Sequence, residues 1–165
     1  MKRIRLFIAA LIFPALVFAG GGIHEADKQF QAQDYSSARY AYKSARDPKK
    51  LSKQELARVD FQIAECDRML SDWHSAESNY QKSINEKYPD DRAKLHLAQM
   101  EQMNGDYAQA ILDYTTYQSL VPSDPSAQIG IDACNDALKW MNEPNRWQIS
   151  NESQLNSKTN DFCPT

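Results

Sequence analysis

The sequence is short of three things that whole classes of function need: glycine, cysteine and a surplus of basic residues. It holds 5 glycines in 165 residues, and three of them stand together at positions 20–22. The remaining two cannot form a glycine-rich loop of the kind that cradles phosphate groups. The formal net charge of -3 argues against nucleic-acid binding, which needs a basic face to neutralise phosphates.

Cysteine and histidine are too scattered for a disulfide framework or a metal site. The three cysteines, Cys66, Cys134 and Cys163, are odd in number and far apart, so we predict that Cys66 and Cys134 are small buried residues. None of the three histidines has a second His or Cys three or four residues later, the spacing that places two ligands on one helix face. No nucleophile–base arrangement is present either. We therefore expect neither an enzyme nor a bound cofactor or metal.

A basic start and an apolar run open the chain. Three basic residues within the first five positions precede the uncharged stretch 6–19, which is too short to span a membrane comfortably as a helix. Small residues at Val17 and Ala19 suit cleavage after position 19. We predict that residues 1–19 are a secretory signal peptide and that the protein is exported, with no membrane span after cleavage. The alternative is an uncleaved anchor.

The body of the chain repeats. Three turn segments align, at 33–38, 71–76 and 105–110, each with an aspartate, an aromatic residue and an alanine in the same order. An alanine stands at a fixed distance before each aspartate, and a tyrosine follows each segment. The columns are Ala26, Ala64 and Ala98; Asp34, Asp72 and Asp106; Ala38, Ala76 and Ala110; Tyr42, Tyr80 and Tyr114. All four columns advance by 38 residues from the first copy to the second and by 34 from the second to the third, which indicates one structural unit used three times.

Each unit is predicted to be a helix, a tight turn and a second helix. The aspartates can cap the second helix, the alanines let two helices approach closely, and the tyrosines fill the space between hairpins. A capping box at Ser52–Glu55 and the pair Asp124–Pro125 mark further helix starts. The expected helices are 23–32, 35–46, 52–70, 73–87, 90–103, 107–120 and 125–141. The fold class is therefore all-α, with three stacked hairpins and a last helix that shields the exposed end.

These columns, with the turn aromatics, resemble the tetratricopeptide repeat (TPR). The resemblance implies a right-handed superhelical stack of about three TPR hairpins plus a C-terminal capping helix over residues 23–141, and a protein-interaction function. The interval between the first two copies is longer than the next one, which indicates a short insertion around 47–50. A departure in the last small-residue column suggests that the third repeat packs differently against the last helix. That column reads Ala45, Ser83 and Tyr117.

The resemblance also implies which residues face a partner, because the first helices of TPR hairpins line the concave face. In this groove the apolar side chains would anchor a partner, and arginine with glutamine would hold an extended backbone or a carboxylate. For Phe61 and Leu95 the alternative is packing against neighbouring helices. The groove candidates are Arg58, Phe61, Glu65, Arg68 and Met69 in repeat two, Arg92, Leu95, Gln99, Gln102 and Met103 in repeat three, and Asp27, Phe30 and Gln31 in repeat one.

The composition shifts after Met141, and residues 142–165 are predicted to be an extended linker that leads into a missing downstream domain. The segments 133–140, 155–157 and 161–164 are similar to a junction in Gram-negative envelope proteins that join a TPR array, a WD-like β-propeller and an OmpA-like peptidoglycan-binding domain. The PorE type, associated with type IX secretion, has this architecture.

That similarity implies a periplasmic adaptor near the outer membrane or cell wall. Its partners would be envelope proteins, and it would reach peptidoglycan only through the missing domain. Two alternatives stay open. One is a structural spacer in such a peptidoglycan-tethered protein, and the other is a disordered C-terminal tail.

Overall fold

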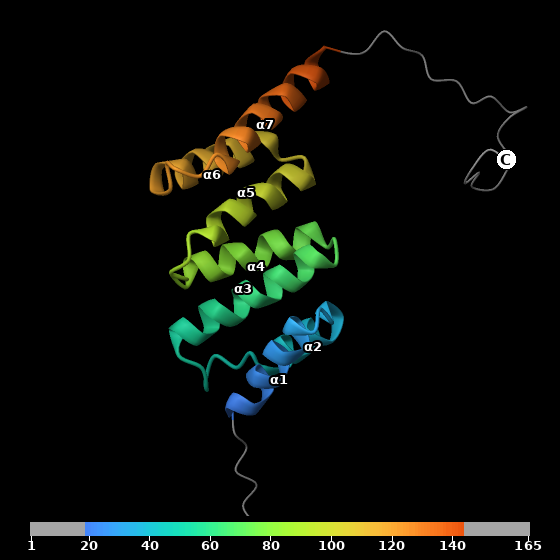
Figure 1. Cartoon of the computed structure of the whole chain (residues 1–165), viewed down its shortest axis with the longest axis vertical. Helices are drawn as coiled ribbons and strands as arrows, with labels where there is room; N and C mark the ends of the chain where they lie inside the picture. Colours follow the sequence, from blue (N-terminus) through green and yellow to red (C-terminus); the bar gives the residue numbers. More distant parts are fainter. Residues whose placement is uncertain (1–18, 144–165) are drawn as a thin grey trace, which may run out of the picture.

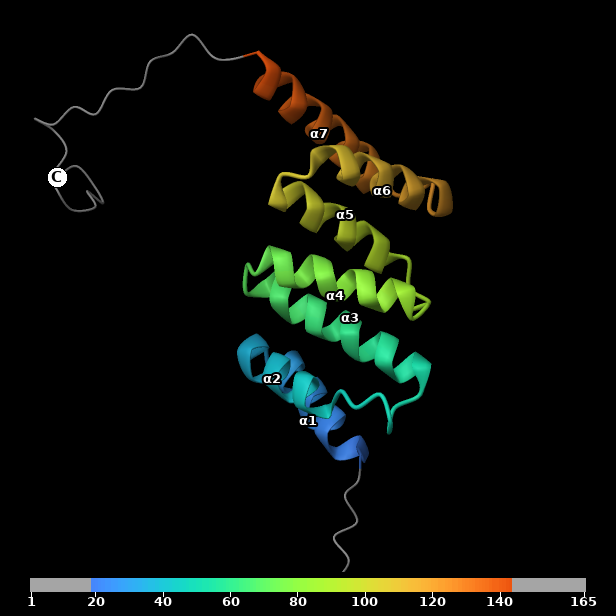
Figure 2. The same cartoon turned by 180° about the vertical axis from the view of Figure 1, so that it is seen from behind.

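The computed structural model describes residues 19–143, with side chains from residue 22 onward. This part of the chain contains seven α-helices and no strand. The helices pile along one axis from α1 at one end to α7 at the other (Figures 1 and 2). They are α1 (Ala19–Gln31), α2 (Tyr35–Ala45), α3 (Lys53–Met69), α4 (Trp73–Asn85), α5 (Arg92–Asn104), α6 (Tyr107–Leu120) and α7 (Ser126–Asn142). The predicted all-α superhelical stack of three hairpins and a last helix is confirmed.

Several sequence predictions concern residues outside this range. The signal peptide, apart from its last residue, and nearly all of the linker 142–165 with Cys163 lie outside the described residues. None of the helices between residues 19 and 143 has the length and the apolar character needed to cross a bilayer.

The repeated columns form the contacts that hold the helices together. All six column alanines are fully buried, and the tyrosines Tyr42, Tyr80 and Tyr114 are at most 2% exposed. The core consists of three clusters, and each cluster lies where three consecutive helices meet. A hairpin alone would leave its tyrosine ring in water, so stacking is what buries the apolar surface.

The turns between paired helices share one backbone geometry. The residue before each column aspartate has a left-handed φ: 62° at Gln33, 59° at Ser71 and 89° at Gly105. Only the third turn uses glycine, which adopts this conformation without strain.

Two of the three column aspartates cap the following helix as predicted. Asp34 accepts a hydrogen bond from the Ser37 backbone N–H, and Asp72 accepts one from Ser75. Asp106 holds the same position but makes no capping bond, which corrects the prediction for the third turn. Its ψ angle is 55°, against 72° and 73° at the two capping aspartates.

The connections between hairpins also follow the sequence closely. The Ser52–Glu55 capping box forms both of its hydrogen bonds. Asp124 accepts a bond from the Ser126 N–H at the start of α7. The longer interval between the first two repeats extends α3 to 17 residues, against 13 in α5. The insertion is therefore a helical turn as well as a loop.

The third hairpin packs differently from the others where the small-residue column ends. Tyr117 is buried, and its hydroxyl donates to Asp124 Oδ2 at 2.7 Å in the loop that leads to α7. This bond and burial raise the pKa of Tyr117 to about 12. The large residue thus ties α6 to the start of the last helix.

Candidate functional site

The candidate site lies on the face formed by the first helices of the hairpins and by α7, here called the first-helix face. It contains three seams, which are the contacts of α2 with α3, of α4 with α5 and of α6 with α7. At each seam the column tyrosine points its hydroxyl toward this face and meets a polar partner. The chemistry of that partner changes from seam to seam.

The first seam holds an ion pair between two residues of this chain. Arg58 Nη2 of α3 donates to Asp27 Oδ1 of α1 at 2.6 Å, and the Tyr42 hydroxyl donates to the same oxygen. Burial and this bond together raise the pKa of Tyr42 far above its usual value. Arg58 was a candidate for binding a partner carboxylate, but its own chain already supplies one.

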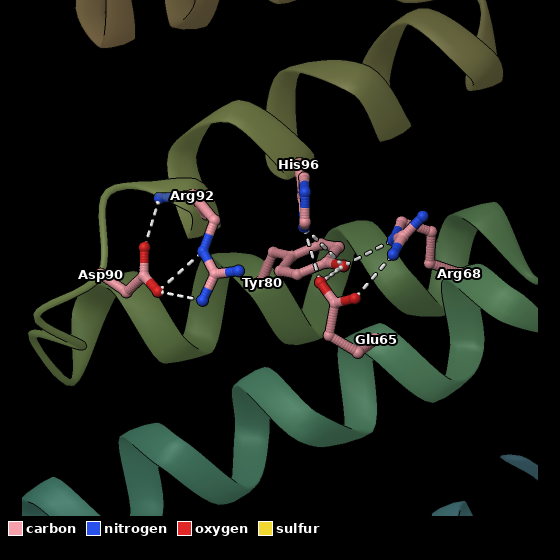
Figure 3. A network of polar contacts seen from close by, with 6 residues as sticks. All are labelled: Glu65, Arg68, Tyr80, Asp90, Arg92 and His96. Atoms are coloured by element: carbon pink, nitrogen blue, oxygen red, sulfur yellow. Dashed lines mark hydrogen bonds and ion pairs between the residues drawn. The ribbon is translucent and has the colours of Figure 1, made fainter. Parts of the chain in front are cut away.

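The second seam holds a larger network around Glu65, which Figure 3 shows from close by. Its carboxylate accepts hydrogen bonds from Arg68 Nη2 at 2.7 Å, from His96 Nδ1 at 2.6 Å and from the Tyr80 hydroxyl. Burial alone would raise the pKa of Glu65, but the three donors outweigh it and lower the pKa to about 2. The carboxylate is therefore ionised at neutral pH and joins α3, α4 and α5.

Arg92 is also engaged within the chain. It holds the position in repeat three that Arg58 holds in repeat two, yet it pairs with Asp90 in the loop before its own helix, with Nη2 2.6 Å from Oδ2 (Figure 3). The position equivalent to Asp27 in the preceding repeat is Glu65, and that carboxylate is already occupied by Arg68 and His96. Arg92 therefore pairs with Asp90, which lies two residues before it in the chain.

Two apolar groove candidates face the interior instead. Phe61 is 5% exposed and stacks on Tyr88 with ring centroids 4.5 Å apart, and Leu95 is 7% exposed in the third core cluster. The alternative of packing against neighbouring helices is therefore correct for both. Tyr88, in the connection after the second hairpin, covers Phe61, and Val121, in the connection after the third hairpin, packs against the cluster that contains Leu95.

The third seam leaves an open pocket of about 500 Å³. Four of the ten candidates in repeats two and three line it: Arg68, Gln99, Gln102 and Met103. The other six, Arg58, Phe61, Glu65, Met69, Arg92 and Leu95, do not. Residues that the sequence analysis did not select complete the lining: Trp73, Met100, Tyr114, Ser126, Ile129, Gly130 and Ala133.

At this pocket α7 approaches the third hairpin closely. A Cβ added to Gly130 would lie 2.3 Å from Cζ of Tyr114, so the tyrosine ring rests on the glycine backbone. The Tyr114 hydroxyl donates to Gln102 Oε1 at 2.7 Å, a neutral partner in place of the acids of the first two seams. The repeat spacing could have identified Ile129 as a lining residue, because Ile129 follows Leu95 at the same interval at which Leu95 follows Phe61.

The opposite side of the stack carries a second contrast between seams. In α3, Asp67 is fully buried and accepts bonds from Arg39 Nη1 at 3.0 Å and Asn79 Nδ2 at 2.7 Å. The equivalent residue of α5, Glu101, is 5% exposed, and its Oε2 has no hydrogen-bond partner. Burial raises the pKa of Glu101 to about 8, and the neighbouring carboxyl of Asp113 adds to the shift.

The predicted burial of Cys66 and Cys134 is confirmed, and both are free thiols. Burial, with Asp67 close by, raises the pKa of Cys66 to about 12, which keeps its thiol protonated. Between residues 19 and 143 no group of three His, Cys, Asp or Glu side chains is arranged to hold a metal ion.

The likeness of this chain to known proteins is found in its structure and not in its sequence. The sequence matches no protein-family model and no curated protein. Among solved structures, the first TPR of Spaghetti (RPAP3) bound to an HSP90 peptide aligns with a TM-score of 0.62 and 18% identity, covering 73% of this chain and 93% of that one. The C-terminal TPR-containing domain of a putative FK506-binding protein of Plasmodium falciparum aligns with a TM-score of 0.62 and 17% identity, covering 76% and 91%.

A bacterial chaperone shows the same likeness. The Yersinia enterocolitica type III secretion chaperone SycD, in complex with a peptide of the translocator YopD, aligns with a TM-score of 0.58 and 15% identity. The alignment covers 72% of this chain and 93% of SycD. Identities this low speak for the fold alone. With its repeated columns, hairpins and superhelical stacking, this chain has the tetratricopeptide-repeat fold.

Proposed function

We propose that this chain is a protein-interaction adaptor that binds a segment of a partner protein on its first-helix face, with no chemical step. The pocket at the third seam carries the proposal. It is about 500 Å³ in volume, within the range of roughly 300–1,000 Å³ typical of ligand pockets. Met103 is 56% exposed and Ile129 is 66% exposed at this site, where apolar side chains in water favour an interaction surface.

The solved relatives support a peptide as the kind of ligand. Two of the solved structures that align with this chain hold a peptide, one from HSP90 on the first TPR of Spaghetti and one from the translocator YopD on SycD. A preformed groove suits this mode of binding because a rigid surface loses little conformational entropy when a segment docks.

A photo-crosslinking experiment tests the proposal in the cell. A benzophenone amino acid replaces Met103 in one variant and Gln128 in another, since Gln128 lies on the exposed side of α7 and bonds to Gln118. We expect a specific protein adduct from position 103 and none from position 128. Equal adducts from both positions, or none from either, would contradict the proposal.

The cellular setting is part of the proposal and has its support in the sequence. Residues 1–19 favour export to the periplasm, and the segments 133–140, 155–157 and 161–164 resemble the junction of PorE-type envelope proteins associated with type IX secretion. The adaptor would then act in a cell-envelope assembly near the outer membrane or cell wall. Fractionation of cells that carry the tagged protein tests this setting, and recovery in the cytoplasm would contradict it.

A structural spacer in a peptidoglycan-tethered envelope protein is the alternative. In that case the stack only separates other domains, and the first-helix face stays unoccupied. The crosslinking experiment distinguishes the two, because a spacer gives no adduct at position 103 although the protein is present in the envelope fraction.

A further inference from the structure

The pocket at the third seam differs in charge from the rest of the first-helix face. The first and second seams place acids and bases side by side, as in Asp27 with Arg58 and Glu65 with Arg68. The pocket is lined mainly by methionine, isoleucine, tyrosine and glutamine side chains, and Arg68 is its one charged residue among those described.

The charge of Arg68 is already paired within the chain. Its Nη2 donates to Glu65 Oε2 at 2.7 Å and its Nε donates to the Tyr80 hydroxyl at 3.2 Å (Figure 3). A ligand carboxylate that reached the remaining N–H groups of Arg68 would meet a charge that Glu65 already neutralises, so the pair offers little net attraction to an anion. The same ligand would also be repelled by the Glu65 carboxylate. The electrostatics of the pocket therefore disfavour an acidic group.

Equivalent positions in the other repeats show what kind of group covers this site. Phe61, Leu95 and Ile129 follow one another at equal intervals along the chain. The Tyr88 ring stacks on Phe61, and Leu95 packs within an apolar cluster that includes Val121. Ile129 is left 66% exposed by the described residues. Two copies of this position are thus packed among apolar groups, whereas no residue between 19 and 143 covers the third.

We propose that the pocket receives a large uncharged side chain, aromatic or long aliphatic, from the partner segment. The inference rests on the proposed function and specifies the chemistry of its partner. The side chain would lie over Ile129 and Met103, as Tyr88 lies over Phe61. Because the Gln102 oxygen accepts from Tyr114, its amide nitrogen points its donors elsewhere and can bond a backbone carbonyl of the segment.

Small probes test this chemistry without knowledge of the partner. N-acetyl-tryptophan amide, N-acetyl-leucine amide and N-acetyl-glutamate amide are titrated into the purified full chain, and the methyl signals of Met103 and Ile129 are followed by NMR. We expect saturable shifts with the first two probes and at least tenfold weaker binding of the glutamate probe. Raising NaCl from 50 to 500 mM should leave the tryptophan affinity unchanged, because no ion pair forms.

A matched pair of variants locates the binding. Ile129→Glu should weaken tryptophan amide binding at least tenfold, whereas Gln128→Glu, one residue away on the exposed side of α7, should leave it unchanged. Both positions are exposed, so the fold is expected to survive, and thermal unfolding checks this. Equal effects of the two variants would overturn the proposal.

Three further outcomes would also overturn it. They are a preference for the glutamate probe, an affinity that falls with salt, and tenfold tighter binding in a variant that ends at residue 143, which would make the chain's own C-terminal segment the occupant. A different result would contradict the proposed function but not the pocket chemistry. If apolar probes bind but position 103 crosslinks to no partner, the pocket chemistry stands and the adaptor role falls.

Discussion

The seam between α2 and α3 and the seam between α4 and α5 pack in the same way, but the first balances its buried acid with a base and the second does not. At the first, buried Asp67 is neutralised by Arg39 and hydrogen-bonded by Asn79. At the second, Glu101 stands in the place of Asp67, while Glu77 and Asp113 stand in the places of Arg39 and Asn79. Every one of these groups at the second seam is an acid.

Shape and charge are therefore specified separately in this stack. Alanines at the close contacts and tyrosines in the gaps recur at both seams, so the helices pack alike. The charged groups at the edges do not recur. The second seam avoids a buried repulsion by keeping a proton on Glu101, whose pKa burial raises to about 8.

Asp67→Ala should break the first seam and have the largest effect. It leaves the Arg39 guanidinium and the Asn79 amide without their buried acceptor, so we expect the free energy of unfolding to fall by about 3–5 kcal/mol. Urea denaturation at pH 7 measures the loss. Asp132→Ala, at an exposed acid of α7, is the control and should change stability by less than about 0.5 kcal/mol. A similar loss in both variants would contradict the assignment.

Glu101→Gln should act in the opposite direction at the equivalent position. Because folding raises the pKa of Glu101 to about 8, the wild-type protein binds a proton more tightly when folded and loses stability as the pH rises toward and through 8. The neutral glutamine does not. We expect the variant to be more stable by about 1–3 kcal/mol at pH 9, with the gain absent below pH 4.

Thermal unfolding across this pH range provides the measurement for Glu101→Gln. Asp136→Asn removes an exposed acid and should show no such pH-dependent gain. A wild-type stability that rises between pH 5 and 9 relative to Glu101→Gln would show the opposite sign and reject the explanation.

Gly130→Ala tests the third seam, where packing replaces charge. Alanine normally stabilises a helix relative to glycine by about 0.5–1 kcal/mol, but here the new Cβ would lie 2.3 Å from the Tyr114 ring. We expect a net loss of about 1–3 kcal/mol in unfolding free energy, measured by urea denaturation. Asn135→Ala, on the exposed side of the same helix, should be neutral or stabilising. A gain from Gly130→Ala would show that α7 does not rest on Tyr114.

Ser71→Gly has the smallest expected effect and compares the turns. Ser71 holds a left-handed φ of 59° that Gly105 adopts at the equivalent turn. Removing the Cβ relieves strain but adds freedom to the unfolded chain, so we expect a gain of up to about 1 kcal/mol. The reverse change, Gly105→Ala, should lose a similar amount although no atom lies within 4 Å of the new Cβ. Calorimetry measures the melting temperature of each variant, and we expect Ser71→Gly to raise it and Gly105→Ala to lower it.

The fold could be predicted from the sequence because its signals are local and repeated. The capping box at Ser52, the turn aspartates and the alanine and tyrosine columns each specify one feature of a hairpin, and three copies agree. Asp106 was the exception, since it holds the capping position without making the bond, and residue identity alone does not fix the side-chain and backbone geometry that the bond needs.

The candidate site was predicted only in part. The repeat pattern placed Gln99, Gln102 and Met103 on the face that contains the pocket. It could not tell that Arg58 and Arg92 find acids of their own chain, or that Phe61 lies under Tyr88. Those outcomes depend on how the chain folds around each residue, and the partner can lie as far as 31 positions away, as for Asp27 and Arg58.

The amino-acid sequence by itself therefore determined which segments are helices, how they pair and in what order they stack, because each of these follows from the spacing of residues along one short stretch. Only the tertiary structure decided which charges are neutralised, which carboxyl keeps a proton and where the pocket opens. Burial and electrostatic pairing are properties of the space between helices, and that space exists only after the helices have packed.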